Sequence, residues 1–192
     1  MPELAGSPHG LLTLDQWDAI EVDQTRRWEL SEGIPIMSPR PHPLHQRISR
    51  RLTQLLEHAL PADLEALQEV EVTTDANFPP SVRAPDIVVV PRRVTVQRSP
   101  RVLAADVLLV VEIVSPGSHW LPQTDHLIKL HEYAKAGIPH YWIVDSTRAP
   151  GEQFLAFNLA DKGYRRLDVQ AGERVRVTEP VQLEFAVRDL TD

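Results

Sequence analysis

Leu-Leu-Val-Val-Glu-Ile-Val, residues 108–114, is the most apolar stretch of this chain and decides its fold. Side chains of both alternating sets are apolar, which is typical of a strand that other elements cover on both faces. Two similar runs, Asp-Ile-Val-Val-Val at 86–90 and His-Tyr-Trp-Ile-Val-Asp at 140–145, predict neighbouring strands. Apolar residues recur at helical spacing over 44–59, and a second helix is expected over 124–137. The sequence thus predicts an α/β fold in which helices flank a mixed β-sheet.

The segments around this core predict smaller elements. Thr13 and Gln16 have the spacing of a capping box at the start of a short helix. Residues 28–37 predict a β-hairpin, and residues 67–74 predict one strand. Thr124 is expected to cap the helix that ends at Gly137. The C-terminal part predicts an antiparallel meander with strands at 154–159, 164–169, 174–177 and 181–187.

The composition is that of an ordinary globular protein. The 192 residues are 42% hydrophobic and 24% charged, and we expect a single domain over 1–192. There is no cysteine, which excludes disulfides and thiolate metal sites. The N-terminus has no signal-peptide pattern, and the longest apolar run, 107–111, is too short to cross a bilayer. We therefore expect no membrane association and a cytoplasmic location.

The formal net charge of −7 argues against a protein that coats nucleic acid by charge alone. Two stretches are nonetheless basic, because 40–60 holds four arginines against Glu57 and 83–101 holds five against Asp86. The arginines are Arg40, Arg47, Arg50 and Arg51 in the first stretch and Arg83, Arg92, Arg93, Arg98 and Arg101 in the second. Each stretch either lines a phosphate-binding groove or forms a solvated surface, and the residues alone leave both readings open.

Glu112 is an anomaly in the central strand, because its neighbours on both faces are apolar. Burying a lone carboxylate costs on the order of several kcal/mol, so it should be neutralised, paired or bound to a metal. The alternatives are a buried salt bridge or a strand end that is wetter than its sequence suggests. Asp86 begins the neighbouring strand, and its alternative role is that of an ordinary turn or strand-cap aspartate.

Two carboxylates at the ends of adjacent strands favour a hard cation. Mg²⁺ is held by one or two carboxylates together with waters and substrate phosphates, an arrangement that suits phosphodiester hydrolysis. Lys129, in the helix after the second carboxylate, is the candidate for the basic group that such a reaction needs. Its alternative role is a surface pair with Asp125, four residues earlier. The residues by themselves do not decide between these roles.

Several motifs carry a family resemblance. They are Trp28-Glu-Leu-Ser-Glu-Gly33, Ser38-Pro39, His45, Arg83-Ala-Pro-Asp86, Val111-Glu-Ile-Val-Ser-Pro-Gly-Ser118, Asp125 with Lys129 and Tyr133, and the run from Ala136 to Asp145. In this order they resemble the Uma-type restriction endonuclease family of the PD-(D/E)XK superfamily. The resemblance implies a restriction-endonuclease-like mixed sheet flanked by helices, with an N-terminal hairpin and C-terminal antiparallel strands. It implies a nuclease core at about 25–146 and a β-rich extension at about 150–190.

The resemblance also implies a set of site residues. Asp86 and Glu112 become ligands of Mg²⁺, with Mn²⁺ as a possible substitute, and Lys129 completes the catalytic set. The superfamily lysine two positions after the glutamate is Val114 here, and Lys129 takes its place from the following helix. Supporting or substrate-contacting roles fall to His45, Glu29, Arg83, Ser115, Asp125 and Tyr133. The loop before Asp125 is a few residues longer than in the family and lacks its usual basic pair, which puts the position of Lys129 in question.

The supporting residues also have plainer interpretations. His45 borders the apolar side of its helix and is interpreted first as a partly buried structural histidine. Glu29 is interpreted as a surface acid of the hairpin, and Tyr133 as a core residue. Ser115 is expected to cap the turn after its strand, and Asp125 to orient the helix lysine.

The sequence therefore predicts a Mg²⁺-dependent endonuclease that cleaves double-stranded DNA. We expect a homodimer, because duplex DNA presents two antiparallel strands. One alternative is a nucleic-acid-binding or mobile-element accessory protein that keeps the fold but cleaves poorly, which the net charge of −7 and the longer loop favour. Another is a homodimeric interaction protein whose carboxylates merely pair with Arg83 or Lys129.

Overall fold

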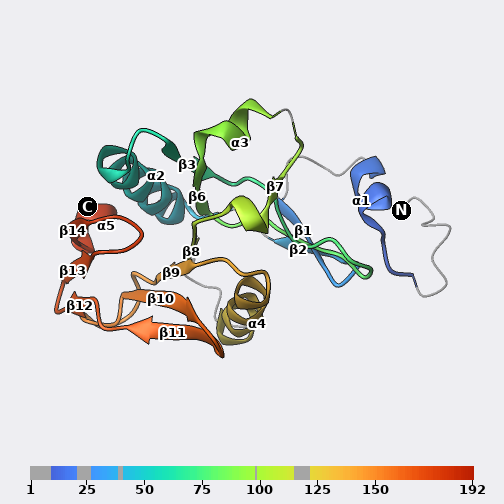
Figure 1. Ribbon diagram of the computed structural model, residues 1–192. Helices are drawn as coiled ribbons and strands as arrows, with labels where there is room; N and C mark the ends of the chain where they lie inside the picture. Colours follow the sequence, from blue (N-terminus) through green and yellow to red (C-terminus); the bar gives the residue numbers. More distant parts are fainter. Residues whose placement is uncertain (1–9, 21–26, 39–40, 98, 115–121) are drawn as a thin grey trace.

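The computed structural model describes residues 10–20, 27–38, 41–97, 99–114 and 122–192 (Figure 1). Its central sheet has six strands in the order β11-β10-β9-β8-β6-β3. These are β3 (Leu64–Gln68), β6 (Ile87–Pro91), β8 (Leu109–Ile113), β9 (His140–Val144), β10 (Phe154–Ala160) and β11 (Gly163–Leu167). Strands β8 and β9 are parallel, and the other neighbouring pairs are antiparallel. The predicted mixed sheet is confirmed.

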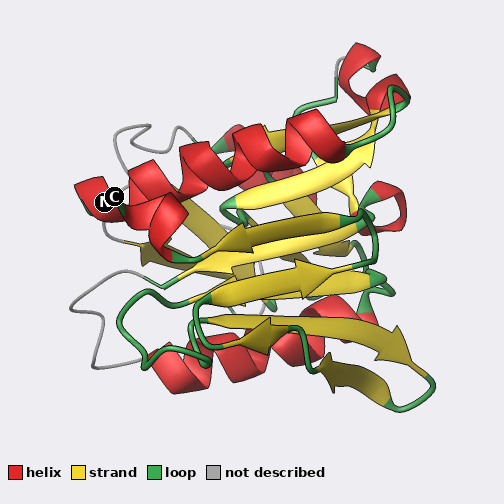
Figure 2. Ribbon diagram, turned by 90° about the vertical axis from the view of Figure 1, so that its left-hand side faces the viewer, coloured by secondary structure: helices red, strands yellow, loops and turns green. Residues whose placement is uncertain are grey.

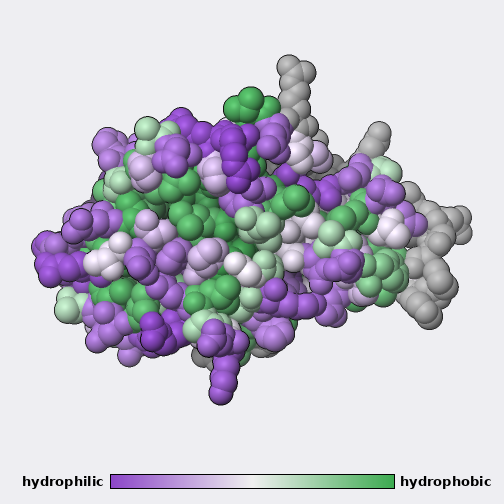
Figure 3. Space-filling view, viewed as in Figure 1, coloured by the Kyte–Doolittle hydropathy of each residue, from purple (hydrophilic) through white to green (hydrophobic). Residues whose placement is uncertain are grey.

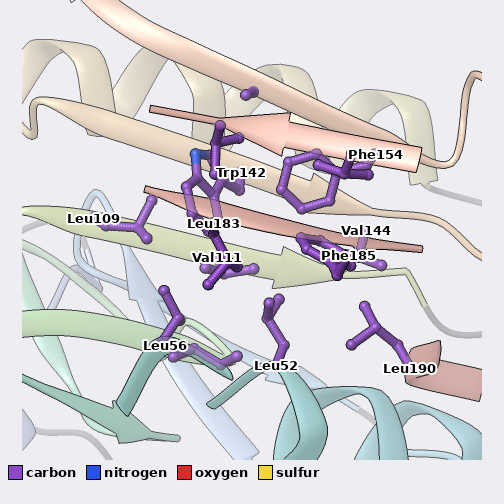
Figure 4. Close-up of a cluster of buried hydrophobic side chains, with 14 of the residues drawn as sticks. Leu52, Leu56, Leu109, Val111, Trp142, Val144, Phe154, Leu183, Phe185 and Leu190 are labelled. Carbon is purple, nitrogen blue, oxygen red and sulfur yellow. The ribbon is translucent and has the colours of Figure 1, made fainter. Parts of the chain in front are cut away.

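Two helices cover opposite faces of this sheet (Figure 2). They are α2 (Pro43–Ala59) and α4 (Pro122–Lys135). Side chains of a strand alternate between the faces, and the buried strands β6, β8 and β9 therefore contribute to both cores. Val111 and Trp142 pack with Leu52 of α2 (Figure 4), whereas Val110 packs in the cluster that contains Tyr133 of α4. The position of each residue in β8 thus decides which helix it meets.

A second sheet, in the order β2-β1-β5-β4-β7, lies beside the first. Its strands are β1 (Arg27–Ser31), β2 (Ile34–Ser38), β4 (Val72–Asp75), β5 (Ser81–Arg83) and β7 (Val102–Leu103). The predicted hairpin β1–β2 turns at Gly33, which has a φ of +77° and would place a Cβ 2.9 Å from Leu11 Cβ. Helix α1 (Leu14–Ala19) has the predicted capping box and packs Trp17 against this sheet.

A small third sheet and a last helix close the α2 side of the molecule. They are β12 (Gln170–Ala171), β13 (Arg174–Val177), β14 (Leu183–Ala186) and α5 (Arg188–Thr191). Val175, Phe185 and Leu190 from these elements belong to the same buried cluster as Leu52. Figure 4 shows Phe185 and Leu190 in this cluster. The C-terminal residues thus complete the core on that face.

Several details differ from the sequence prediction. Residues 67–74 do not form one strand, because Glu69 has a φ of +54° and separates β3 from β4. Helix α4 begins at Pro122 rather than after Thr124. The C-terminal strands are no single meander, since β10 and β11 join the central sheet and β12 to β14 form their own. The short elements α3 (Arg92–Val96), η1 (Ala104–Asp106) and α5 were not predicted.

The surface is largely polar. Figure 3 shows hydrophilic side chains over most of one face, with smaller apolar patches between them. The exposed large apolar residues include Ile34 and Ile36 of β2 and Phe78 in the loop before β5. Among the described residues, no helix is both long and apolar enough to cross a membrane.

Candidate functional site

The two predicted metal ligands lie at the ends of adjacent strands. Asp86 directly precedes β6, and Glu112 is the fourth residue of β8. Ile87 pairs with Val111 in antiparallel register. Asp86, which precedes Ile87, therefore lies opposite Glu112, which follows Val111. Both carboxylates are buried, with exposed fractions of 1% for Asp86 and 4% for Glu112. Glu112 points to the face that α4 covers, because it lies two residues after Val110.

Asp86 is held by three donors. Its Oδ1 accepts a hydrogen bond from Arg27 Nη1 at 2.5 Å. Its Oδ2 lies 3.1 Å from His45 Nε2 and accepts a hydrogen bond of 2.6 Å from the backbone N–H of Ile113. Burial alone would raise the pKa of Asp86, but the His45 hydrogen bond and the charge of Arg27 outweigh it and hold the pKa well below its usual range. Asp86 is therefore an ionised carboxylate.

Glu112 has weaker compensation. Lys129 Nζ lies 3.1 Å from Glu112 Oε1, and the Tyr133 hydroxyl donates a hydrogen bond of 2.8 Å to the same oxygen. Burial raises the pKa of Glu112, and the nearby charge of Asp86 adds to the rise, whereas Lys129 opposes it. The net effect is a raised pKa, so this carboxylate would gain from a further cation.

Glu29 of β1 is part of the same cluster. It is 2% exposed, so its interpretation as a surface acid of the hairpin was wrong. Glu29 Oε1 lies 3.3 Å from Lys129 Nζ, and Oε2 lies 3.1 Å from Arg83 Nη1. Burial acts to raise the pKa of Glu29, but Lys129 and the arginines lower it overall. Lys129 therefore joins carboxylates from two different sheets.

Arg83 does not contact Asp86, although the two are close in sequence. Its Nε and Nη2 bind Glu132 of α4 at 2.5 and 2.7 Å, and its Nη2 also donates to Ser31 Oγ at 3.0 Å. This bidentate pair, with Arg83 only 1% exposed, ties α4 to β5. Because Glu132 and Lys129 share α4, the pair also fixes where the lysine lies. Sequence reasoning missed Glu132.

Arg27 was also missed, and it is the most unusual side chain of the site. Besides its bond to Asp86, its Nη2 lies 3.8 Å from Glu29 Oε1. Within the described residues, the buried Nε and Nη2 atoms of Arg27 have no hydrogen-bond partner. Arg27 and Glu29 are two residues apart in β1, so strand periodicity places both on one face. That period is the signal in the sequence that could have pointed to Arg27.

Two predicted residues cannot be placed. Ser115 and the side chain of Asp125 lie outside what the structure describes. Tyr133 is fully buried as expected of a core residue, but its hydroxyl also contacts Glu112. His45 is buried, and its ring joins α2 to Asp86.

The donor set suits a hard divalent cation. Both recorded contacts of Glu112 fall on Oε1, and among the described residues no hydrogen bond or ion pair involves its Oε2. Asp86 Oδ1 accepts the hydrogen bond from Arg27, so a metal ion would have to displace Arg27 to bind this oxygen. No group of three or more His, Asp or Glu side chains among the described residues is arranged to hold a metal by itself. Any ion held here would complete its shell with waters or substrate oxygens, as Mg²⁺ commonly does.

A mixed sheet between helices, with two carboxylates at the ends of its central strands and a lysine from the helix that covers them, defines a restriction-endonuclease-like protein. The model of the Uma2 family, described as "Putative restriction endonuclease", matches residues 13–190, and the chain belongs to this family. The predicted family and fold class are thus confirmed.

A solved structure shares the fold. It is the crystal structure of a putative nuclease belonging to DUF820 from Anabaena variabilis, with a TM-score of 0.68 and 19% sequence identity. The match covers 94% of this chain and 97% of that one. A search of curated proteins finds no match.

Replacing Lys129 by methionine is expected to lower the free energy of unfolding by about 3 to 5 kcal/mol at pH 8, because Glu29 and Glu112 lose their shared cation. Without that cation the pKa of each carboxyl rises in the folded state. The folded protein then binds protons more readily than the unfolded chain, so the loss of stability becomes smaller as the pH falls from 8 to 5. Urea unfolding at both pH values measures the two effects.

Lys135→Met is the matched control, because Lys135 lies on the same helix but its side chain is 68% exposed. Its surface pair with Asp75 should contribute about 0 to 1 kcal/mol. If Lys129→Met were no more destabilising than this control, the buried carboxylates would not depend on Lys129.

Proposed function

We propose that this protein is a Mg²⁺-dependent endonuclease that hydrolyses phosphodiester bonds of DNA, with Mn²⁺ able to replace Mg²⁺. The observation that carries the proposal is the side-by-side burial of Asp86 and Glu112, with Lys129 Nζ 3.1 Å from Glu112. Asp86 and Glu112 would hold the ion. When bound, the ion supplies charge for the phosphate and a more acidic water.

The remaining side chains have separate tasks in this proposal. Lys129 donates hydrogen bonds toward a water at Glu112 and offsets the negative charge that develops on the phosphate. Tyr133 orients Glu112 through its hydroxyl, and His45 orients Asp86. These neighbours fix the carboxylates before substrate arrives, which lowers the cost of organising the site during the reaction.

Double-stranded DNA is the proposed substrate, cut by a homodimer. Cleavage of both strands of a duplex by one kind of site is simplest when a second copy supplies the second site, related by two-fold symmetry. Because the chain carries a net charge of −7, affinity would have to come from local groups near the site rather than from the whole surface.

A second candidate function is a nucleic-acid-binding accessory protein that cleaves poorly. It is favoured by Arg27, whose guanidinium occupies Asp86 Oδ1 at 2.5 Å and competes with a metal ion for that oxygen. The two candidates differ in whether a divalent ion displaces Arg27 at millimolar concentration and in whether plasmid is cut.

Metal binding is the first test. Titration calorimetry with MnCl₂ should show at least a tenfold weaker affinity for Asp86→Asn and for Glu112→Gln, because each change removes a charged ligand, and tenfold corresponds to about 1.4 kcal/mol. Asp161→Asn, in the turn between β10 and β11, is the control for loss of a surface acid. Equal Mn²⁺ affinity in all four proteins would rule out this pair as the metal site.

Arg27→Gln should change Mn²⁺ affinity in the opposite direction. The substitution frees Asp86 Oδ1 and removes a cation that lies near three carboxylates, so Mn²⁺ should bind several-fold tighter than to wild type. Arg93→Gln is the control, because Arg93 pairs with Asp106 on the surface. Weaker Mn²⁺ binding by Arg27→Gln alone would show that Arg27 supports the metal site instead of competing for it.

Cleavage of supercoiled plasmid separates the enzyme from the accessory protein. Wild type should nick plasmid with Mg²⁺ or Mn²⁺ and not with EDTA, and Asp86→Asn should lower the rate at least 100-fold, since it removes a ligand needed for chemistry. Circular dichroism checks that the variant is folded. Nicking that persists in Asp86→Asn and in Glu112→Gln would mean that the activity belongs to a contaminant or to another site.

A further inference from the structure

A surface cavity of about 460 Å³ lies directly behind the proposed metal site. The first turns of α2 form one wall, and the end of β3 with the residue after it forms the other. Its polar lining residues include His45, Arg47, Ser49, Arg50, Gln68 and Glu69. The volume lies within the range of small-molecule sites, which is about 300 to 1,000 Å³.

His45 connects this cavity to the site. The ring lines the cavity, while its Nε2 lies 3.1 Å from Asp86 Oδ2. The other ring nitrogen, Nδ1, is buried and has no hydrogen-bond partner among the described residues. Buried polar atoms are rarely left without a partner, so among the described residues this nitrogen marks an incomplete set of hydrogen bonds at the cavity wall. The cavity and Asp86 are thus separated by the width of one imidazole ring.

Arg50 gives the cavity an available positive charge. It is exposed on α2, and within the described residues no hydrogen bond or ion pair involves it. Arg47 uses one nitrogen to donate to the backbone carbonyl of Thr191, and no ion pair involves it in the part of the chain that the structure describes. Glu69 is the one acid among the lining residues. Two arginines against one carboxylate make the cavity favourable for an anion.

The arginines of the two basic stretches differ in whether acidic side chains neutralise them. In the second stretch, Arg83, Arg92, Arg93 and Arg101 all pair with acidic side chains, and Arg98 lies outside the described residues. In the first stretch, Arg51 donates to the backbone carbonyl of Asp189, and Arg47 and Arg50 face the cavity. Unneutralised arginine charge thus lies beside His45 and comes from the first stretch.

We propose that this cavity binds the phosphate and sugar of an unpaired nucleotide of the substrate strand, next to the bond that is cut. The proposal rests on the proposed function and adds a subsite to it. Arg50 contacts the phosphate, and the amide of Gln68, held 2.6 Å from Ser49 Oγ, is placed to hydrogen-bond the sugar or base. A cavity of this volume has room for one nucleotide and not for a duplex about 20 Å wide, so the nucleotide must leave the helical stack to enter.

Fluorescence anisotropy tests the subsite without chemistry. A labelled 12-nucleotide single strand and the matching duplex are titrated with protein in EDTA, at several salt concentrations. Arg50→Ala should weaken single-strand affinity about five- to tenfold and reduce the slope of log K against log salt by about 0.7, the value for one phosphate contact. Duplex affinity should change less than twofold, and Arg50→Lys should retain the salt slope because it retains the charge.

Arg166→Ala is the matched control, since Arg166 is an exposed arginine on β11, at the opposite edge of the central sheet from β3. The proposal is overturned if wild type does not bind the single strand, if Arg50→Ala equals the control, or if the duplex is weakened as much as the single strand. Displacement of the strand by micromolar nucleoside 5′-monophosphate would also overturn it, because the cavity would then be a small-molecule site.

Because EDTA removes divalent ions, the outcome of the strand titration does not depend on the metal-binding and cleavage tests of the proposed function. Mn²⁺ binding and plasmid nicking test the roles of Asp86 and Glu112. The strand titration tests the role of Arg50 alone. A protein that fails the metal test and passes the strand titration has the subsite but belongs to the accessory class.

Discussion

The buried ammonium of Lys129 is the charge on which the arrangement of the site depends. It lies 3.1 Å from Glu112 in the central sheet and 3.3 Å from Glu29 in the second sheet, and it belongs to neither sheet but to α4. One charge therefore joins three elements. Burying any one of these groups alone would cost on the order of several kcal/mol, so the three stabilise one another only while all are in place. This mutual dependence fixes the position of α4 relative to both sheets.

The same dependence requires that α4 be held firmly, because Lys129 reaches both sheets from this helix. The bidentate pair between Arg83 and Glu132 provides that hold, since it ties α4 to β5. The placement of the buried lysine therefore depends on the buried arginine pair.

The sequence predicted the elements whose burial leaves a visible pattern of apolar residues. Strands β6, β8 and β9 are apolar on both faces because helices cover both, and this requirement is visible residue by residue. Contacts between residues far apart in the chain have no such pattern. The pairs of Arg27 with Asp86 and of Arg83 with Glu132 join residues 59 and 49 positions apart, and the burial of Glu29 depends on both arginines. The break at Glu69 was hidden because a positive φ at a glutamate has no local signature.

Under the proposed function, the charges around the site would favour replacement of Arg27 by a divalent ion. Glu29, Asp86 and Glu112 bring three carboxylates to this region, and Arg27 and Lys129 bring two cations, with Arg83 matched by Glu132. When all three carboxylates are ionised, one negative charge remains, which agrees with the raised pKa of Glu112. A divalent ion in place of Arg27 would neutralise the cluster, and the released guanidinium would match the charge of an incoming phosphodiester. Substrate and metal would then favour each other's binding, because the phosphate gives the displaced arginine a partner.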